Sequence, residues 1–75
     1  MSRVLVTGGA GTIGAAVVAR LLRDGAHDVR VSDQREPPAW MRERCEVHTG
    51  DLRDLDVALD ALRGCSHVIL SLIHI

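Results

Sequence analysis

The 75-residue sequence contains no lysine, tyrosine or phenylalanine, and Trp40 is its one aromatic residue. Without lysine the chain cannot form a phosphate-binding P-loop, because the G-x-x-x-x-G-K-[ST] pattern requires one. The nine basic residues are therefore all arginines, and ten acidic residues leave a formal net charge of -1. A charge so close to zero predicts no basic surface for nucleic acid or an anionic membrane, and we expect neither as a partner.

Cysteine is also scarce. Cys45 and Cys65 form neither a CxxC motif nor a disulfide framework, which favours a reducing compartment. The N-terminus has no signal-peptide pattern, and no apolar run is long enough to span a membrane. The four histidines have no metal-ligand spacing with each other or with the cysteines, so no metal site is predicted. We expect a cytoplasmic protein without a membrane anchor.

The apolar pattern alternates between strand and helix periods along the chain. Short apolar or alternating runs at 3–6, 28–33, 45–49 and from residue 67 predict four strands. Helical spacing predicts one helix from Thr12 to about Asp24, ended by Gly25. A second is expected after the N-cap Asp54, where Leu55, Ala58, Leu59 and Leu62 follow the spacing of one helix face.

Residues 34–44 have no clear period and contain Pro37-Pro38, which predicts a surface loop with room for a helical turn at 39–44. The resulting order is β-α-β-loop-β-α-β. This order predicts an α/β fold with a parallel sheet, flanking helices and right-handed crossovers. At 75 residues the chain forms at most one small domain.

Two overlapping glycine patterns follow the first predicted strand and open the first predicted helix. Gly9-x-Gly11-x-x-Gly14 is G-x-G-x-x-G, and Thr7-Gly8-x-x-Gly11-x-x-Gly14 is its T-G-x-x-G-x-x-G variant. Glycine tolerates the positive φ of a tight turn and lets the backbone approach a pyrophosphate. We expect Gly14 to let the helix pack close to the sheet, with phosphate at the helix N-terminus. A glycine turn that only saves space is the alternative.

Two acidic positions extend this pattern. Asp33 ends the second predicted strand, 19 positions after Gly14, where a carboxylate can accept hydrogen bonds from ribose hydroxyls and repel a 2′-phosphate. It therefore favours NAD over NADP, although Arg35 just beyond it is suited to a 2′-phosphate. Asp51 and Leu52 follow the third strand, where they could meet an adenine. A solvated turn aspartate and a strand-ending cap are the respective alternatives.

Together, residues 7–14, Asp33 and residues 50–54 resemble the N-terminal part of an extended short-chain dehydrogenase/reductase of the NAD-dependent epimerase/dehydratase family. The resemblance spans about residues 3–69 and implies a Rossmann domain, truncated after about its fourth strand, that binds NAD(H) or NADP(H). It implies that Asp33 holds the adenosine ribose and that Asp51 and Leu52 hold the adenine. The implied pyrophosphate turn comprises Gly8, Gly11, Thr12, Ile13 and Gly14.

Members of this family often act on nucleotide-sugars through transient oxidation by the nicotinamide, or reduce related carbonyl substrates. Their Tyr-x-x-x-Lys pair is absent here, so no catalytic residue is assigned. The resemblance implies the NAD(P)-binding portion of a sugar-nucleotide epimerase, dehydratase or related reductase, with a homodimeric parent protein. The alternatives are a non-catalytic dinucleotide-sensing regulator on the same fold and another Rossmann-like domain, such as a methyltransferase.

Residues 70–75, Leu-Ser-Leu-Ile-His-Ile, depart from the family pattern. They resemble the translation of a sequencing-library adapter, the transposase end CTG TCT CTT ATA CAC ATC. We therefore divide the chain into the N-terminal part of a dinucleotide-binding domain at 1–69 and a non-native tail at 70–75. A genuine apolar continuation of the fourth strand is the alternative.

Overall fold

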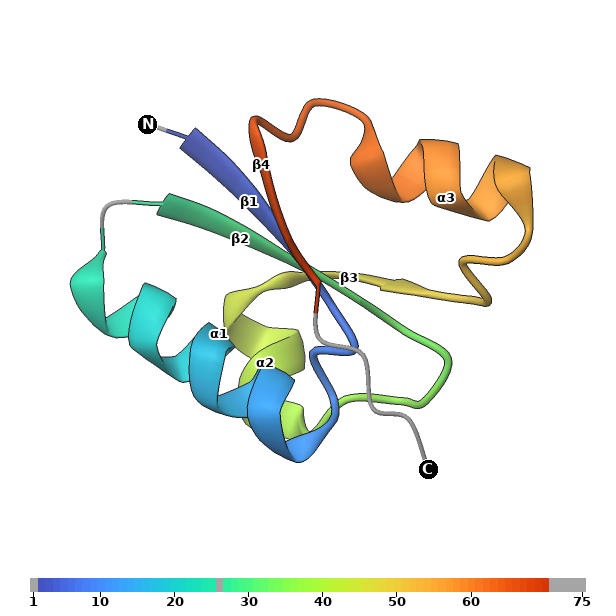
Figure 1. Ribbon diagram of the computed structural model, residues 1–75. Helices are drawn as coiled ribbons and strands as arrows, with labels where there is room; N and C mark the ends of the chain where they lie inside the picture. Colours follow the sequence, from blue (N-terminus) through green and yellow to red (C-terminus); the bar gives the residue numbers. More distant parts are fainter. Residues whose placement is uncertain (1, 26, 71–75) are drawn as a thin grey trace.

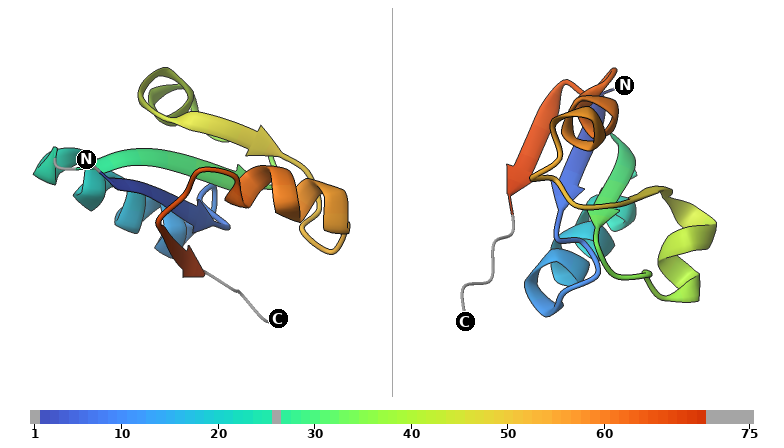
Figure 2. Two further views of the ribbon diagram at one scale, coloured as in Figure 1. Left: turned by 90° about the horizontal axis from the view of Figure 1, so that it is seen from above. Right: turned by 90° about the vertical axis from the view of Figure 1, so that its right-hand side faces the viewer.

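The computed structural model describes residues 2–25 and 27–70, and in it strands alternate with helices. The four strands of this part form one parallel sheet in the order β3-β2-β1-β4. Helices α1 and α2 lie on one face of the sheet and α3 on the other (Figures 1 and 2). The predicted Rossmann-type α/β fold is confirmed. The elements are β1 (Ser2–Thr7), α1 (Thr12–Asp24), β2 (His27–Asp33), α2 (Ala39–Arg44), β3 (Glu46–Thr49), α3 (Leu55–Leu62) and β4 (His67–Leu70).

The predicted helix ends follow from capping chemistry. Helix α1 has the predicted bounds, and Gly25 after it adopts a left-handed conformation with φ of 70°. Asp54 caps α3, because its side chain accepts hydrogen bonds from the backbone N–H groups of Asp56 and Val57. Strands β1 and β2 each begin one residue before the prediction, and β3 begins one residue after it. The predicted non-native tail at 70–75 lies outside the described residues, apart from residue 70 itself.

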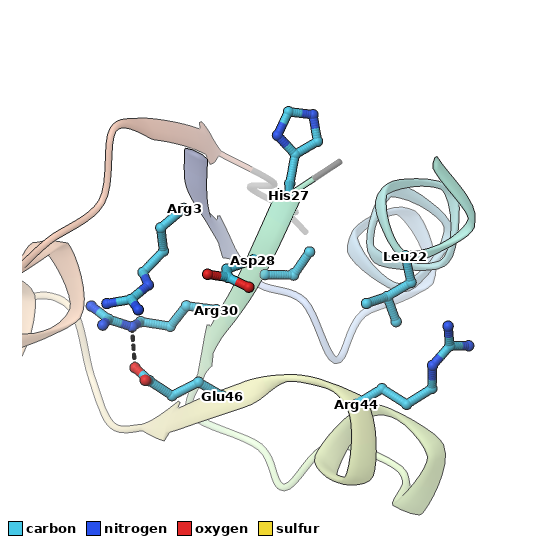
Figure 3. A pocket seen from close by; sticks show the side chains of 8 residues that line it. Arg3, Leu22, His27, Asp28, Arg30, Arg44 and Glu46 are labelled. Carbon is cyan, nitrogen blue, oxygen red and sulfur yellow. Dashed lines mark ion pairs between the residues drawn. The ribbon is translucent and has the colours of Figure 1, made fainter. Parts of the chain in front are cut away.

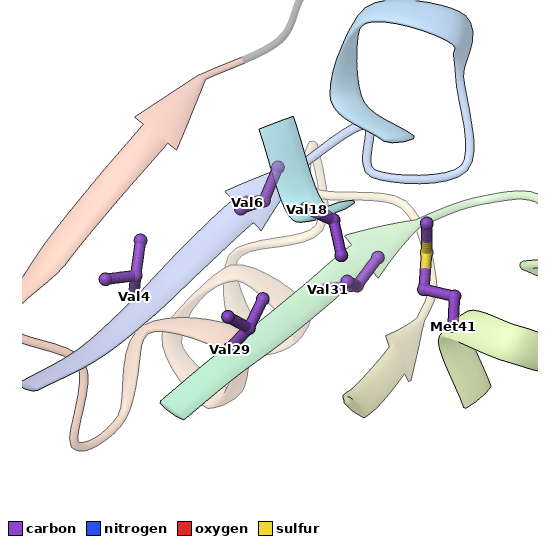
Figure 4. Packing of buried hydrophobic residues seen from close by; sticks show 6 residues of the cluster. All are labelled: Val4, Val6, Val18, Val29, Val31 and Met41. Carbon is purple, nitrogen blue, oxygen red and sulfur yellow. The ribbon is translucent and has the colours of Figure 1, made fainter. Parts of the chain in front are cut away.

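One face of the sheet is an apolar core. The valines of β1 and β2 that point to this face stand in register, since Val4 pairs with Val29 and Val6 with Val31. Helix α1 packs on them through Val18, which is fully buried. Figure 4 shows how the valines and one methionine of α2 gather between the sheet and these helices. This layer fixes the position of α1, whose N-terminus follows the glycine turn.

The helical turn that the sequence allowed at 39–44 is present, but the stretch does not lie wholly on the surface. Residues 39–44 form helix α2, and Met41 within it is completely buried against the core. Pro37 is buried as well. The sequence pattern does not reveal that this stretch packs on the core, because a single apolar side chain among polar residues produces no periodicity.

The opposite face of the sheet is mixed, with the buried Leu5 of β1 beside polar residues of β2 and β3. Strand alternation places Arg30 and Ser32 of β2 on this face, together with Glu46 and His48 of β3, with which they stand in register. Ser32 and Arg30 are both buried, with exposed fractions of 0% and 5%. Helix α3 therefore covers a surface that offers hydrogen-bonding groups as well as apolar area.

The predicted apolar face of α3 does not pack on this surface. Leu55, Leu59 and Leu62 are 70%, 53% and 43% exposed, whereas the small Ala61 is completely buried. The side chain of Arg30 crosses from the sheet to the C-terminal end of α3. Its Nη1 donates to the carbonyl oxygens of Ala61 at 2.8 Å and Arg63 at 2.7 Å.

Arg30 is the main polar contact between α3 and the sheet. Carbonyl groups at the end of a helix lack intrahelical partners and carry partial negative charge, so a guanidinium there satisfies and stabilises them. Its Nε also forms an ion pair with Glu46, as Figure 3 shows at a pocket beside the amino-terminal ends of the strands. Within the described residues, no helix has both the length and the apolar character needed to cross a membrane.

Replacing Arg30 tests this role. We expect Arg30→Ala to lower the free energy of unfolding by about 2–4 kcal/mol, because it leaves buried carbonyls and Glu46 without their cation. Urea denaturation followed by circular dichroism measures the change. The control is Arg20→Ala, which removes an exposed ion pair with Asp24 and should cost less than about 1 kcal/mol. Equal losses in the two variants would contradict the assignment.

Candidate functional site

The turn between β1 and α1 is a left-handed bend at Gly8. Its φ is 68°, a conformation that side chains with a Cβ rarely adopt. The Gly8 N–H donates to the carbonyl oxygen of Ser32 at 2.7 Å, and the Gly11 N–H donates to the Gly8 carbonyl oxygen at 3.0 Å. These two bonds anchor the turn to β2 and fold it back upon itself.

Two further positions of the turn require glycine because they leave no room for a Cβ. A Cβ at Gly14 would lie 2.8 Å from both the carbonyl carbon of Gly8 and the Cα of Gly9, far inside contact distance. We expected Gly14 to allow close packing on the sheet, but its close neighbour is the backbone of the turn. The sheet contact belongs to Gly9, where a Cβ would be 3.3 Å from the Cβ of Val31 and nearer still to its Cγ1.

The N-terminus of α1 presents backbone N–H groups to the turn. Its N-cap is Gly11, no side chain caps it, and its first turn contains no acidic residue. The first bond of the helix runs from the Ala15 N–H to the Gly11 carbonyl at 2.8 Å. The N–H groups of residues 12–14 therefore have no partner within the helix, and the positive end of the helix dipole lies there. This arrangement suits an anion such as a pyrophosphate.

The side chains of the helix start point away from such an anion. Thr12 is exposed, and Ile13 is 62% exposed and lines a shallow apolar surface with Ala16, Val17 and other residues of α1. Any contact of Ile13 with a phosphate would therefore use its backbone N–H.

Asp33 joins the end of β2 to the glycine turn. Its carboxylate is buried, and Oδ2 accepts a hydrogen bond of 2.9 Å from the backbone N–H of Ala10. Arg35 donates its backbone N–H to Oδ1 at 2.9 Å and adds two guanidinium contacts of 3.2 Å. Burial by itself raises the pKa of Asp33, but the bonds from Arg35 and Ala10 outweigh it and hold the pKa below the ordinary value of an aspartate.

Asp51 lies at the end of the neighbouring strand. The Gly50 N–H donates to the Asp33 carbonyl at 3.0 Å, which holds the ends of β2 and β3 together. The side chain and backbone N–H of Arg53 bind the Asp51 carboxylate, with a shortest distance of 2.7 Å from Nη2 to Oδ2, and lower its pKa to about 2. Leu52, the adjacent predicted residue, is half-buried.

The predicted residues thus gather at the carboxyl ends of β1, β2 and β3, where ligands bind in open α/β sheets (Figure 1). Sequence reasoning missed Ala10, which contributes only a backbone N–H and so leaves no signal in the sequence. It also missed the pairing of both aspartates with an arginine. The repeated Asp-x-Arg spacing at 33–35 and 51–53 could have indicated it.

Comparison with known proteins assigns the chain to a family. The profile of the "NAD dependent epimerase/dehydratase family" matches residues 4–73. A 3 beta-hydroxysteroid dehydrogenase/Delta 5-->4-isomerase of Mycobacterium tuberculosis is 44% identical over 64 residues, which cover 85% of this chain and 17% of that protein. The chain belongs to the NAD-dependent epimerase/dehydratase family, and it spans about a sixth of the length of this relative.

Solved structures share the fold. A short-chain dehydrogenase/reductase superfamily protein from Agrobacterium tumefaciens with bound NAD has a TM-score of 0.76 and 34% identity, covering 97% of this chain and 21% of the other. MoeE5 in complex with UDP-glucose and NAD has a TM-score of 0.72 and 33% identity, covering 92% of this chain and 21% of the other.

The close contact at Gly14 predicts that even one added methyl group disturbs the turn. We expect Gly14→Ala to destabilise the chain by about 1–3 kcal/mol, because the Gly8 backbone must move to accommodate the Cβ. Thermal unfolding measures the effect. Ala16→Ser, at an exposed position on the same helix, is the control and should change stability by less than about 0.5 kcal/mol. A Gly14→Ala protein as stable as the control would refute the steric argument.

The lowered pKa of Asp33 predicts a specific pH dependence of stability. A depressed folded pKa contributes stability that is complete above the unfolded value, about 3.9, and is lost as pH falls through the folded value. At pH 7 we expect Asp33→Asn to be less stable by about 2 kcal/mol. The difference from the wild type should shrink as pH falls below about 4, as followed by urea unfolding. A difference that stays constant or grows on acidification would contradict the pairing.

Proposed function

We propose that this chain is the dinucleotide-binding portion of an NAD(P)-dependent enzyme, with NAD as the preferred cofactor. The observation that carries the proposal is the hydrogen bond from the Ala10 N–H to Asp33, which brings a carboxylate beside the turn that precedes the uncapped N-terminus of α1. A pyrophosphate and a ribose are the two adenosine-side groups that these elements would recognise.

The proposed contacts divide the cofactor among the predicted residues. The backbone N–H groups of Thr12, Ile13 and Gly14 would hold the pyrophosphate, with Gly8 and Gly11 shaping the turn. Asp33 would accept hydrogen bonds from the ribose hydroxyls, and its negative charge disfavours a 2′-phosphate. The adenine would lie at the ends of β2 and β3, near Asp51 and Leu52. When bound, the nicotinamide supplies the hydride chemistry.

The comparisons support NAD and a hydroxyl or carbonyl substrate. The Agrobacterium protein and MoeE5 were both solved with NAD. MoeE5 was also solved with UDP-glucose, and the mycobacterial relative bears the name of a hydroxysteroid dehydrogenase. We therefore propose that the whole protein oxidises a secondary alcohol or reduces a ketone, on a sugar nucleotide or on another substrate. The 75 residues contain no tyrosine and no lysine, so their part in this chemistry is to bind and orient the cofactor.

Titration of the chain with NAD, NADP and S-adenosylmethionine tests the proposal. We expect NAD to bind most tightly, and Asp33→Asn to weaken NAD by about tenfold, because it replaces the charged acceptor of the ribose hydroxyls. NADP should weaken less, so that the preference for NAD falls. Isothermal titration calorimetry measures all three ligands.

The matched control is Asp24→Asn, which removes a carboxylate from the exposed end of α1, where it pairs with Arg20. It should leave the affinities for NAD and NADP unchanged. Tighter binding of S-adenosylmethionine than of NAD, or an unchanged ratio of NAD to NADP in Asp33→Asn, would overturn the proposed site.

A further inference from the structure

The carboxylate that we assign to the ribose already has a full set of hydrogen bonds. A carboxylate offers about four acceptor positions. Asp33 fills them with the N–H groups of Ala10 and Arg35, both at 2.9 Å, and with Nε and Nη2 of the Arg35 guanidinium, both at 3.2 Å. Two bonds thus come from the backbone and two from one side chain.

The two kinds of bond differ in how readily they can be exchanged. The backbone donors are fixed by the turn and by the end of β2, so they stay when a ligand arrives. The Arg35 side chain is 60% exposed, whereas that of Asp33 is 6% exposed. The guanidinium can therefore swing into solvent, and its departure frees one acceptor position on each carboxylate oxygen.

We propose that Arg35 is a specificity-determining residue that competes with the cofactor ribose for Asp33. This inference rests on the proposed function. The 2′- and 3′-hydroxyls need the two positions that the guanidinium occupies, so NAD binds only after the ion pair opens. The displaced guanidinium stays within reach of the ribose, where it favours a 2′-phosphate. Arg35 therefore weakens NAD and strengthens NADP.

A second Asp-x-Arg pair lies on the neighbouring strand end, and it provides a comparison within the same chain. Arg53 binds both oxygens of Asp51, but these side chains are 87% and 37% exposed. Solvent screens such a pair, so opening it costs little. The carboxylate of the Asp33 pair is more buried, so opening this pair costs more than opening the pair at Asp51. The Asp33 pair therefore has the larger effect on cofactor binding.

The experiment compares wild type with Arg35→Ala by titrating each with NAD and NADP. We expect Arg35→Ala to bind NAD about two- to fivefold more tightly, the range that the loss of one competing ion pair allows, and to bind NADP more weakly. Arg35→Lys keeps the charge but loses the planar two-point contact, so its NAD affinity should lie between the two. An NAD affinity of Arg35→Ala equal to or below that of wild type overturns the inference.

The control for charge alone is Arg42→Ala. Arg42 forms its ion pair with Glu36, at 2.6 Å, and not with Asp33, so this variant loses the same charge without removing a bond to that carboxylate. It should bind both dinucleotides equally or more weakly than wild type, because the phosphates lose an attractive cation. If Arg42→Ala tightens NAD as much as Arg35→Ala does, the effect is not competition at Asp33 and the inference fails.

Adenosine provides a readout that a purely structural role of Arg35 would not change. It carries the ribose hydroxyls but no phosphate, so its affinity has no direct dependence on salt. Raising the ionic strength weakens the exposed side of the ion pair. Adenosine should therefore bind wild type more tightly at high salt, and Arg35→Ala equally at all salt concentrations. Equal salt responses reject competition, whereas a wild type that binds no dinucleotide at all rejects the proposed function itself.

Discussion

The structure depends most on the close approach of α1 to the turn that precedes it. The helix begins directly against the backbone of Gly8 and Gly9, which leaves no volume for a side chain at Gly14. Because the helix starts so near the strand end, its unpartnered N–H groups and its positive dipole end lie at the carboxyl edge of the sheet. The valine layer beneath α1 holds it in this position. The close approach of α1 to the turn therefore determines both the packing of this helix and the position of the candidate anion site.

The two faces of the sheet are held to their helices by different interactions. The face under α1 and α2 is built from aligned valines and is held by the burial of apolar area. The face under α3 carries Arg30 and Ser32 and is held partly by directional bonds to the end of that helix. The buried guanidinium finds carbonyl acceptors at this helix end, whereas the leucines of α3 remain exposed.

The sequence predicted the parts of the fold that depend on local chemistry. The left-handed Gly25 and the Asp54 cap act within a few residues of themselves, so the helix ends could be derived from them. The orientation of α3 and the burial of Met41 depend on groups far away in the chain, and no local pattern contains them. The turn and the strand-end aspartates were located by spacing, whereas the Ala10 bond uses a backbone group that any residue but proline carries.

Asp33 illustrates how a buried charged group at a strand end is satisfied. A carboxylate buried at the end of β2 would be unfavourable without hydrogen-bond donors. Two backbone donors satisfy half of its capacity, and the exposed side chain of Arg35 satisfies the other half. Under the proposed function, a ribose that replaces the arginine must overcome the stabilisation that this ion pair provides. If Asp33 binds the ribose as proposed, the two guanidinium bonds that stabilise the end of β2 also oppose binding, so affinity and stability are opposed at this residue.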